Sequence, residues 1–347
     1  MKEKRLKEAV PLLVAWYRGH RRELPWRKGE GPYPVWISEI MLQQTRIEAA
    51  IPYYERFMSE LPDVKALAEV PEERLLKLWE GLGYYSRARN LKKAAETIME
   101  NGGTMPQKAE ELRKLPGIGD YTAGAIASIA FGEPSPAVDG NVLRVIMRLW
   151  NREDDVLSAK TKKTVFEALS EVYPTGEEAA LLTEGLMELG EVVCVPNGEP
   201  KCELCPLREL CEARKKGTAI LLPKRKEKAP RRQEQKTVFL LRCGERYALH
   251  RREDKGLLAG LWEFPNEDGC FSEEEAKEWL SGLGFSVRSV EPCGEAKHVF
   301  SHVEWKMTGY WVEVEKEAVF VWKTAEEVQN SVALPSAFAF FEKQISG

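Results

Sequence analysis

The chain has 347 residues and a formal net charge of −4, with 43% hydrophobic and 31% charged residues. This composition is that of an ordinary globular protein, and it excludes a chain that is basic overall, as many nucleic-acid-binding proteins are. Any contact with a nucleic acid must therefore be local. The length suits two domains.

The N-terminal residues predict neither an export signal nor a membrane span. MKEKRLKEAVPLLVAWYRGH, at 1–20, is charged first and then only briefly apolar. A membrane span needs roughly 18 apolar residues, which this segment lacks. We therefore expect a cytoplasmic protein.

Residues 1–216 are predicted to form a helical domain, because apolar residues recur at three-to-four spacing between short Pro or Gly breaks. The stretch ISEIMLQQT, at 37–45, sets Glu39 inside an apolar run. A carboxylate buried there without a partner costs several kcal/mol or takes up a proton. Either Glu39 points outward, or its proton is its purpose.

A glycine-rich turn is predicted in LPGIGDYTAGAIASIA, at 115–130, between two helical patterns. Gly117 and Gly119 allow a tight hairpin whose N–H groups can be aimed at an anion such as a DNA phosphate. A plain turn between packed helices needs no ligand, so this pattern alone leaves both interpretations open.

A second carboxylate precedes a helix in PAVDGNVLRVIMRLW, at 136–150. Asp139 can cap that helix, and a carboxylate held by helix N–H groups is expected to keep a low pKa. An ionised Asp139 and a protonated Glu39 would form the acid and counter-charge that cleave glycosidic bonds. The sequence does not show that the two residues meet.

Four of the seven cysteines lie in one short segment, 194–211, with the spacing C-x7-C-x2-C-x5-C. In a reducing compartment this clustering favours a metal site over disulfides. Structural zinc is the alternative, but four cysteines in one compact run, with Pro206 after the third, favour an iron–sulfur cluster. The predicted ligands are Cys194, Cys202, Cys205 and Cys211.

The composition changes after Lys216. Residues 217–236 are predicted to be a basic linker, which is either a solvated tether or a DNA contact. Beyond it, 237–347 contains strand patterns such as KTVFLLRC and VEWKMTGYWVEV and helical patterns such as SEEEAKEWLSGL. The predicted fold is therefore an all-α domain followed by an α+β domain.

Together these stretches resemble the helix-hairpin-helix DNA glycosylases, and most closely the adenine DNA glycosylase (MutY) family. The resemblance spans nearly the whole chain. It depends on LPWR, SEIMLQQT, GLGYYSRARNL, LPGIGDYTAGAIAS, VDGNVLRV, TEGLMELG, the four cysteines and FSH at 300–302.

The resemblance implies a base-excision repair enzyme that flips adenine opposite 8-oxoguanine or guanine out of duplex DNA and hydrolyses its glycosidic bond. It implies that Glu39 protonates N7 of adenine and that Asp139 stabilises the oxocarbenium ion, with or without a transient adduct. Asn141 is expected to line this site, and Tyr121 to form a hydrogen bond near Asp139. Tyr121 also stands where related endonuclease III enzymes have a Schiff-base lysine, so we expect a monofunctional glycosylase.

The resemblance also implies DNA-contacting residues. Arg27 and Glu184 match residues that surround the extruded adenine, and Gln44 and Tyr84 match residues that wedge into the base stack. Phe300, Ser301 and His302 match the loop that reaches 8-oxoguanine. The C-terminal domain looks like a Nudix domain at GLLAGLWEFP but lacks the R-E-x-x-E-E pattern that binds magnesium, so we expect no nucleotide hydrolysis there.

The implied cofactor is a 4Fe-4S cluster with a role in structure and DNA docking. Its first cysteine interval has seven residues where the family usually has six, and a loop with Gly and Pro should absorb the extra one. We expect a monomer in the bacterial cytoplasm, associated with the nucleoid, with downstream repair proteins as further partners.

Two rival interpretations stay open at this point. A thymine or uracil mismatch glycosylase of the same superfamily would share the cluster and the aspartate, although Glu39 and FSH argue against it. A non-enzymatic scaffold would use the hairpin and the cluster only to dock on DNA.

Overall fold

A computed structural model describes residues 2–29, 31–225 and 230–345. The chain forms two compact units, Met1–Glu69 with Asn90–Glu227 and Val70–Arg89 with Lys228–Gly347. Among the described residues, no helix combines the length and the apolar character needed to cross a membrane.

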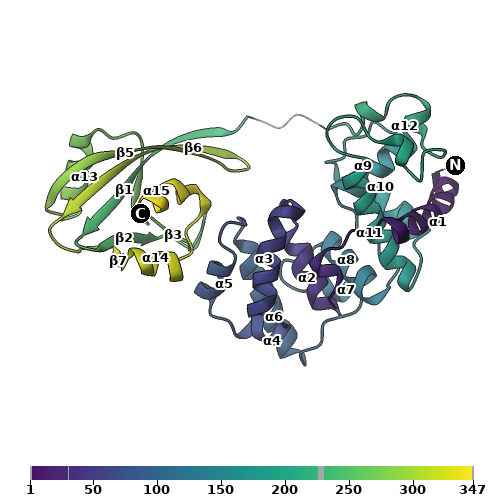
Figure 1. Cartoon of the computed structure of the whole chain (residues 1–347), viewed down its shortest axis with the longest axis horizontal. Coiled ribbons are helices and arrows are strands. Elements are labelled where there is room, and N and C mark those ends of the chain that lie inside the picture. The colour runs from purple at the N-terminus through teal and green to yellow at the C-terminus, as the bar shows by residue number, and fades with distance from the viewer. Residues whose placement is uncertain (1, 30, 226–229, 346–347) are drawn as a thin grey trace. The chain divides into compact units, whose positions relative to one another are not determined.

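The first unit is built from helices (Figure 1). They are α1 (Lys2–His20), η1 (Pro25–Arg27), α2 (Pro32–Met41), α3 (Ile47–Glu60), α4 (Val64–Glu69), α7 (Ala109–Leu112), α8 (Asp120–Phe131), α9 (Gly140–Trp150), α10 (Ala159–Ser170), α11 (Glu177–Val192), η2 (Cys202–Leu204), α12 (Glu212–Lys215) and η3 (Ala219–Leu221). Helix α6 (Ser86–Glu100) begins in the second unit and continues into the first.

Helix α11 lies at the centre of the helical core and packs against α1, α8 and α9. Its apolar residues Leu182, Leu186 and Leu189 are almost completely buried, as is Tyr17 of α1. Burying such side chains fully contributes about 1.5–3 kcal/mol each. This packing fixes the positions of the polar residues that the same helices carry.

The second unit contains a mixed sheet in the order β3-β2-β1-β6-β5. Its strands are β1 (Arg232–Cys243), β2 (Arg246–Arg251), β3 (Trp262–Glu263), β4 (Asn266–Asp268), β5 (Val287–Val299), β6 (Val303–Val314) and β7 (Val321–Thr324). Strands β1 and β6 are parallel, whereas β5 and β6 form the long antiparallel hairpin seen in Figure 1.

Both faces of this sheet are buried. Successive side chains of β1 point to opposite faces of the sheet, and each set packs into its own apolar cluster. Val238 and Leu240 belong to one apolar cluster, and Phe239 and Leu241 belong to another. The helices of this unit are α5 (Glu72–Leu78), α13 (Glu273–Gly282), α14 (Ala325–Ser331), η4 (Ser336–Phe338) and α15 (Ala339–Ile345). The α+β character predicted for this part of the chain is confirmed.

The segment 70–89 belongs to the second unit although it lies within the span predicted for the helical domain. The Lys77 ammonium donates to the carbonyl of Val332 at 2.9 Å, and Glu80 accepts the N–H of Leu334 at 2.7 Å. Periodicity within a helix does not reveal such partners, because they lie about 250 residues away in the sequence.

The predicted linker, 217–236, includes 226–229, which lie outside the described residues. Strand β1 begins at Arg232 rather than after Lys236, because Arg232 already pairs with Val303 at the start of β6. The basic composition of this stretch hides its strand, since Arg, Gln and Glu are not typical strand residues.

Candidate active site

Glu39 lies on α2 and is 7% exposed. The hydroxyl of Tyr121, on α8, donates a hydrogen bond of 2.6 Å to its Oε2. Burial raises the pKa of Glu39 to about 7, the negative charges of Asp139 and Glu184 add to this rise, and the Tyr121 hydrogen bond and Arg27 oppose it. Glu39 is therefore an inward-facing acid, and its raised pKa leaves a large share of it protonated near neutral pH.

Asp139 is the N-cap of α9. Its Oδ1 accepts the N–H of Val142 at 2.7 Å, and its Oδ2 accepts the side-chain amide of Asn141 at 2.8 Å. The predicted cap is therefore present, but the predicted low pKa is wrong in direction. Burial of the carboxyl raises the pKa of Asp139, and the donors from Val142 and Asn141 and the charge of Arg144 only partly offset that rise.

Tyr121 interacts electrostatically with both carboxyl groups, because the charges of Glu39 and Asp139 each raise its pKa in addition to the effect of burial. Its hydroxyl donates a hydrogen bond to Glu39. The sequence had predicted a hydrogen bond near Asp139 instead. The charge of Asp139 also acts on Glu39. The two carboxyl groups therefore belong to one site, with Tyr121 as their shared neighbour.

A buried arginine continues the site beyond Asn141. Arg144 donates to Oδ1 of Asn141 at 2.7 Å, to the carbonyl of Gly190 at 2.6 Å and to the carbonyl of Cys194 at 2.7 Å. A Cβ added at Gly190 would lie 2.6 Å from Cβ of Asn141, so only glycine lets α11 approach α9 this closely. This close approach locks the amide that holds Asp139.

Arg27 and Glu184 form an ion pair of 3.2 Å between Nε and Oε1, and the charges of both act on Glu39. A second acid, Glu188, also binds Arg27, at 2.9 Å, and is 2% exposed. Glu188 was not among the residues predicted from the sequence. Its position four residues after Glu184, on the same face of α11, was the available signal.

The hairpin glycines Gly117 and Gly119 are both exposed. Gly117 has a φ of +75°, and a Cβ there would lie 2.6 Å from Cβ of Asn90, so the turn requires glycine. Gly119 is the N-cap of α8 and supplies no side-chain cap. The hairpin thus presents the beginning of a helix at the surface, as the DNA-binding interpretation requires.

Gln44 and Tyr84 are both exposed residues with left-handed backbone, at φ values of 62° and 48°. Such conformations are uncommon outside glycine, and they cluster at functional positions. The ring of Tyr84 is 48% exposed and lies beneath the guanidinium of Arg87, 5.5 Å from its centre. These two residues belong to different units and are not placed relative to each other.

Phe300, Ser301 and His302 form the turn between β5 and β6. The Phe300 ring packs edge-on against Trp305 at 4.9 Å, whereas Ser301 and His302 are exposed. The Ser301 hydroxyl lies 3.2 Å from Nδ1 of His302. One aromatic residue therefore anchors a turn that presents two polar side chains.

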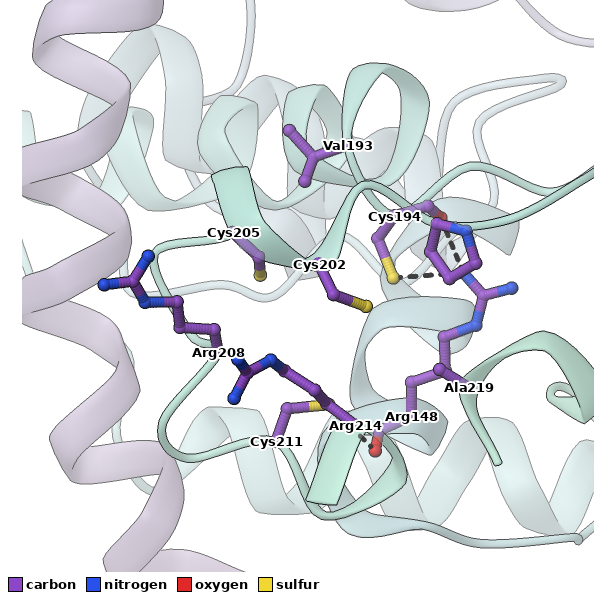
Figure 2. Close-up of a pocket in the computed structure, with 10 residues that line it drawn as sticks. Arg148, Val193, Cys194, Cys202, Cys205, Arg208, Cys211, Arg214 and Ala219 are labelled. Atoms are coloured by element: carbon purple, nitrogen blue, oxygen red, sulfur yellow. Dashed lines mark hydrogen bonds between the residues drawn. The ribbon is translucent and has the colours of Figure 1, made fainter. Parts of the chain in front are cut away.

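The four clustered cysteines line one pocket in the first unit, together with Arg148, Arg208 and Arg214. Figure 2 shows their sulfur atoms around a common space. Nη1 of Arg148 lies 3.2 Å from Sγ of Cys194. Within the described part of the chain, no group of three or more His, Cys, Asp or Glu side chains could hold a single metal ion.

Similarity to known proteins identifies the class of enzyme to which this chain belongs. Residues 37–175 match the HhH-GPD superfamily of base excision DNA repair proteins, and residues 237–341 match the NUDIX domain. Among solved structures, a thermostable thymine-DNA glycosylase is similar with a TM-score of 0.55 and 28% identity, over 61% of this chain and 98% of that one. An endonuclease III in a non-covalent DNA complex gives a TM-score of 0.53 and 25% identity, over 62% and 98%. The protein is a DNA glycosylase.

Curated relatives then narrow the family. The chain is 31% identical to the adenine DNA glycosylase of Homo sapiens, over 96% of this chain and 74% of the human protein. It is 34% identical to the adenine DNA glycosylase of Buchnera aphidicola subsp. Schizaphis graminum, over 84% and 83%. This chain belongs to the adenine DNA glycosylase family.

Proposed function

We propose that this enzyme removes adenine paired with 8-oxoguanine or guanine in duplex DNA, without cutting the strand, and so initiates base excision repair. The observation that carries the proposal is the pair of carboxyl groups, buried Glu39 and partly buried Asp139, which both act on Tyr121, the first through a hydrogen bond and the second through its charge. In this arrangement the catalytic residues are Glu39, Asp139, Tyr121 and Asn141.

Glu39 is the general acid. Adenine leaves poorly as an anion, so a proton delivered to N7 makes departure possible and contributes roughly 10² to 10⁴ in rate. A pKa of about 7 leaves a large share of Glu39 protonated at neutral pH. The Tyr121 hydroxyl fixes the orientation of the carboxyl that delivers this proton.

Asp139 stabilises the positive charge that develops on the sugar. It accepts hydrogen bonds from Val142 and Asn141, whereas Glu39 accepts one from Tyr121. More donors favour the ionised form, so the two carboxyl groups are pushed apart in pKa even though burial raises both. Water then completes the hydrolysis.

Strand cleavage is not part of this reaction. A Schiff base needs an amine, and the position that holds the lysine in endonuclease III enzymes holds Tyr121 here. The Tyr121 hydroxyl is committed to Glu39. We therefore assign base release alone to this site.

The remaining assignments concern DNA. Arg27 and Glu184 receive the extruded adenine, Gln44 and Tyr84 enter the base stack, and Gly117 and Gly119 bind a phosphate. Phe300, Ser301 and His302 read the opposite 8-oxoguanine. The division of labour is then catalysis in the first unit and lesion reading in the second, with the connecting segment ending where β1 begins at Arg232, in a monomer acting at the bacterial nucleoid.

We assign a 4Fe-4S cluster to Cys194, Cys202, Cys205 and Cys211. Four thiol groups in one pocket with three arginines supply the ligands and the positive surroundings that an anionic cluster needs. The cluster would cross-link the loop 194–211 and support its docking on DNA, and no step of the hydrolysis passes through it. A broad visible absorbance and about four irons per chain, as the cluster formula requires, would support this assignment.

The test is single-turnover base release from duplexes that carry adenine opposite 8-oxoguanine, adenine opposite guanine, or thymine opposite guanine. We expect adenine release, no strand nicking before alkali treatment, and no thymine release. Glu39→Gln and Asp139→Asn should each reduce release at least about a hundredfold while damage binding persists. Thymine release would support the activity named for the similar thymine-DNA glycosylase instead, and unchanged variants would indicate a scaffold.

A further inference from the structure

Glu188 is a buried carboxylate whose oxygens are committed to two arginines. Nε of Arg22 donates to its Oε1, Nη2 of Arg22 lies 3.2 Å from its Oε2, and Nη2 of Arg27 lies 2.9 Å from the same oxygen. Its side chain is 2% exposed. Three charged N–H contacts leave this group little capacity to bind a substrate.

Glu184 is held more loosely. Its ion-pair distances are 3.2 Å to Nε of Arg27 and 3.7 Å to Nη2 of Arg21. It lies one helical turn before Glu188 on α11, and the guanidinium of Arg27 spans the two carboxylates. Of these two buried acids, Glu184 is therefore the one with acceptor capacity left for a ligand.

Arg27 has a fixed place between them. Its guanidinium carbon lies 5.5 Å from the centre of the Tyr17 ring, and its Nη1 donates to the carbonyl of Arg22 at 3.1 Å. If Glu188 lost its charge, Glu184 would be the nearest remaining partner for this cation. A tighter pair with Arg27 would then occupy the Glu184 oxygens.

We propose that Glu188 is a positioning residue that sets the preference for adenine: it holds Arg27 so that Glu184 stays free to accept a hydrogen bond from the exocyclic amine of the extruded base. This inference rests on the proposed function, because it takes Arg27 and Glu184 as the adenine-contacting pair. A carboxylate that accepts from this amine discriminates against a purine that lacks it.

A purely structural ion network makes a different prediction. Removing one partner of a buried pair destabilises a protein strongly, whatever the substrate. A structural role would therefore lower the release of every base by the same factor, whereas positioning acts on the base that carries the amine. The ratio of two substrates separates these cases, because the fraction of folded enzyme cancels from it.

The experiment compares single-turnover release of adenine and of unsubstituted purine, each opposite guanine, by full-length Glu188→Gln, Glu188→Asp and Glu191→Gln. Glu191 is the matched control, because it binds Arg22 at 2.8 Å on the exposed end of the same helix. We expect Glu188→Gln to lower adenine release about tenfold or more and purine release less than about threefold. Glu188→Asp keeps the charge and should fall between, and Glu191→Gln should match the wild type.

A double-mutant cycle tests the route of the effect. In a Glu184→Gln background, Glu188→Gln should change adenine release less than about twofold, because the carboxylate through which Glu188 acts is already absent. Equal losses for both bases, or full additivity in the cycle, would overturn the proposal. If the wild type released no adenine opposite 8-oxoguanine or guanine, the proposed function itself would fail, which is a separate result.

Discussion

At the residue scale, burial and hydrogen-bond donors have opposite effects on the pKa of each carboxyl group of the site. Burial is the largest influence on both Glu39 and Asp139, and it raises both pKa values. The sequence correctly indicated the apolar surroundings of Glu39 and the cap at Asp139. It did not show how deeply the Asp139 carboxyl is enclosed, because that depends on helices far away in the chain.

The first prediction concerns the pH dependence of adenine release. With a Glu39 pKa of about 7, the single-turnover rate should fall about tenfold per unit above that pH, and it should fall again in acid where Asp139 takes up a proton. The Tyr121 hydrogen bond lowers the pKa of Glu39, so Tyr121→Phe should move the alkaline fall to higher pH. An alkaline fall at unchanged or lower pH in this variant would contradict the assignment of Glu39 as the acid.

The second prediction concerns stability, and its sign follows from proton linkage. The pKa of Glu39 rises from 4.5 to about 7 on folding, so its stabilising proton is present in full below pH 4.5 and is lost as the pH rises to about 7. Glu39→Gln is neutral throughout and can still accept from Tyr121. Its free energy of unfolding should exceed that of the wild type by on the order of 2 kcal/mol at pH 8.

Urea denaturation of both proteins at pH 8 and pH 4.5 would measure this difference. The gain should nearly vanish at the lower pH, where Glu39 is protonated in the folded chain and already half protonated in the unfolded chain. A gain that persists unchanged at pH 4.5 would show that it does not come from the ionisation of Glu39. The expected pattern, greater stability with lost activity, is that of a residue kept for catalysis.

At the scale of elements, the site depends on how closely helices approach one another. The sequence correctly predicted the hairpin glycines and the helix after Asp139. It did not indicate that Gly190 and Asn141 meet. From the sequence alone, a glycine inside a helix indicates only a lower helix propensity. The contact joins residues 49 positions apart, and only packing reveals it.

The third prediction tests this contact. In Gly190→Ala the new Cβ would lie 2.6 Å from Cβ of Asn141, so α9 and α11 must separate. We expect a loss of about 1–3 kcal/mol in the free energy of unfolding and slower adenine release, because Asn141 is moved from Asp139. Gly140→Ala is the control for stability, since its Cβ would meet nothing within 4 Å. An equal loss in both variants would show that close packing is not the cause.

At the scale of the whole molecule, a helical part and an α+β part are both found, as predicted. The boundaries of the two compact units, however, do not follow the change in composition along the chain. The change in composition after Lys216 comes before the α+β part, because the first unit continues to Glu227 and β1 begins at Arg232. Residues 70–89 also join the C-terminal residues in one unit. Arg89 donates to the carbonyl of Ala259 at 2.7 Å, in addition to the contacts of Lys77 and Glu80. Composition is a local property, so it cannot report pairings of this range.

The fourth prediction follows from that grouping. A chain that ends at residue 236 loses the partners of Lys77 and Glu80 in addition to the turn at 300–302. We expect faster amide hydrogen exchange in α5 and slower adenine release opposite guanine as well as opposite 8-oxoguanine, because the segment that carries Tyr84 loses its support. The comparison is a full-length chain with Ala at Phe300, Ser301 and His302, in which the support of α5 is intact.

This full-length variant should lose the preference for 8-oxoguanine over guanine and keep most of its release opposite guanine. The two variants therefore separate lesion reading, which we assign to the turn at 300–302, from support of the 70–89 segment by the rest of the second unit. If truncation lowered only the release opposite 8-oxoguanine and left exchange in α5 unchanged, the contacts of Lys77 and Glu80 would have no functional consequence. The C-terminal residues would then act through the turn alone.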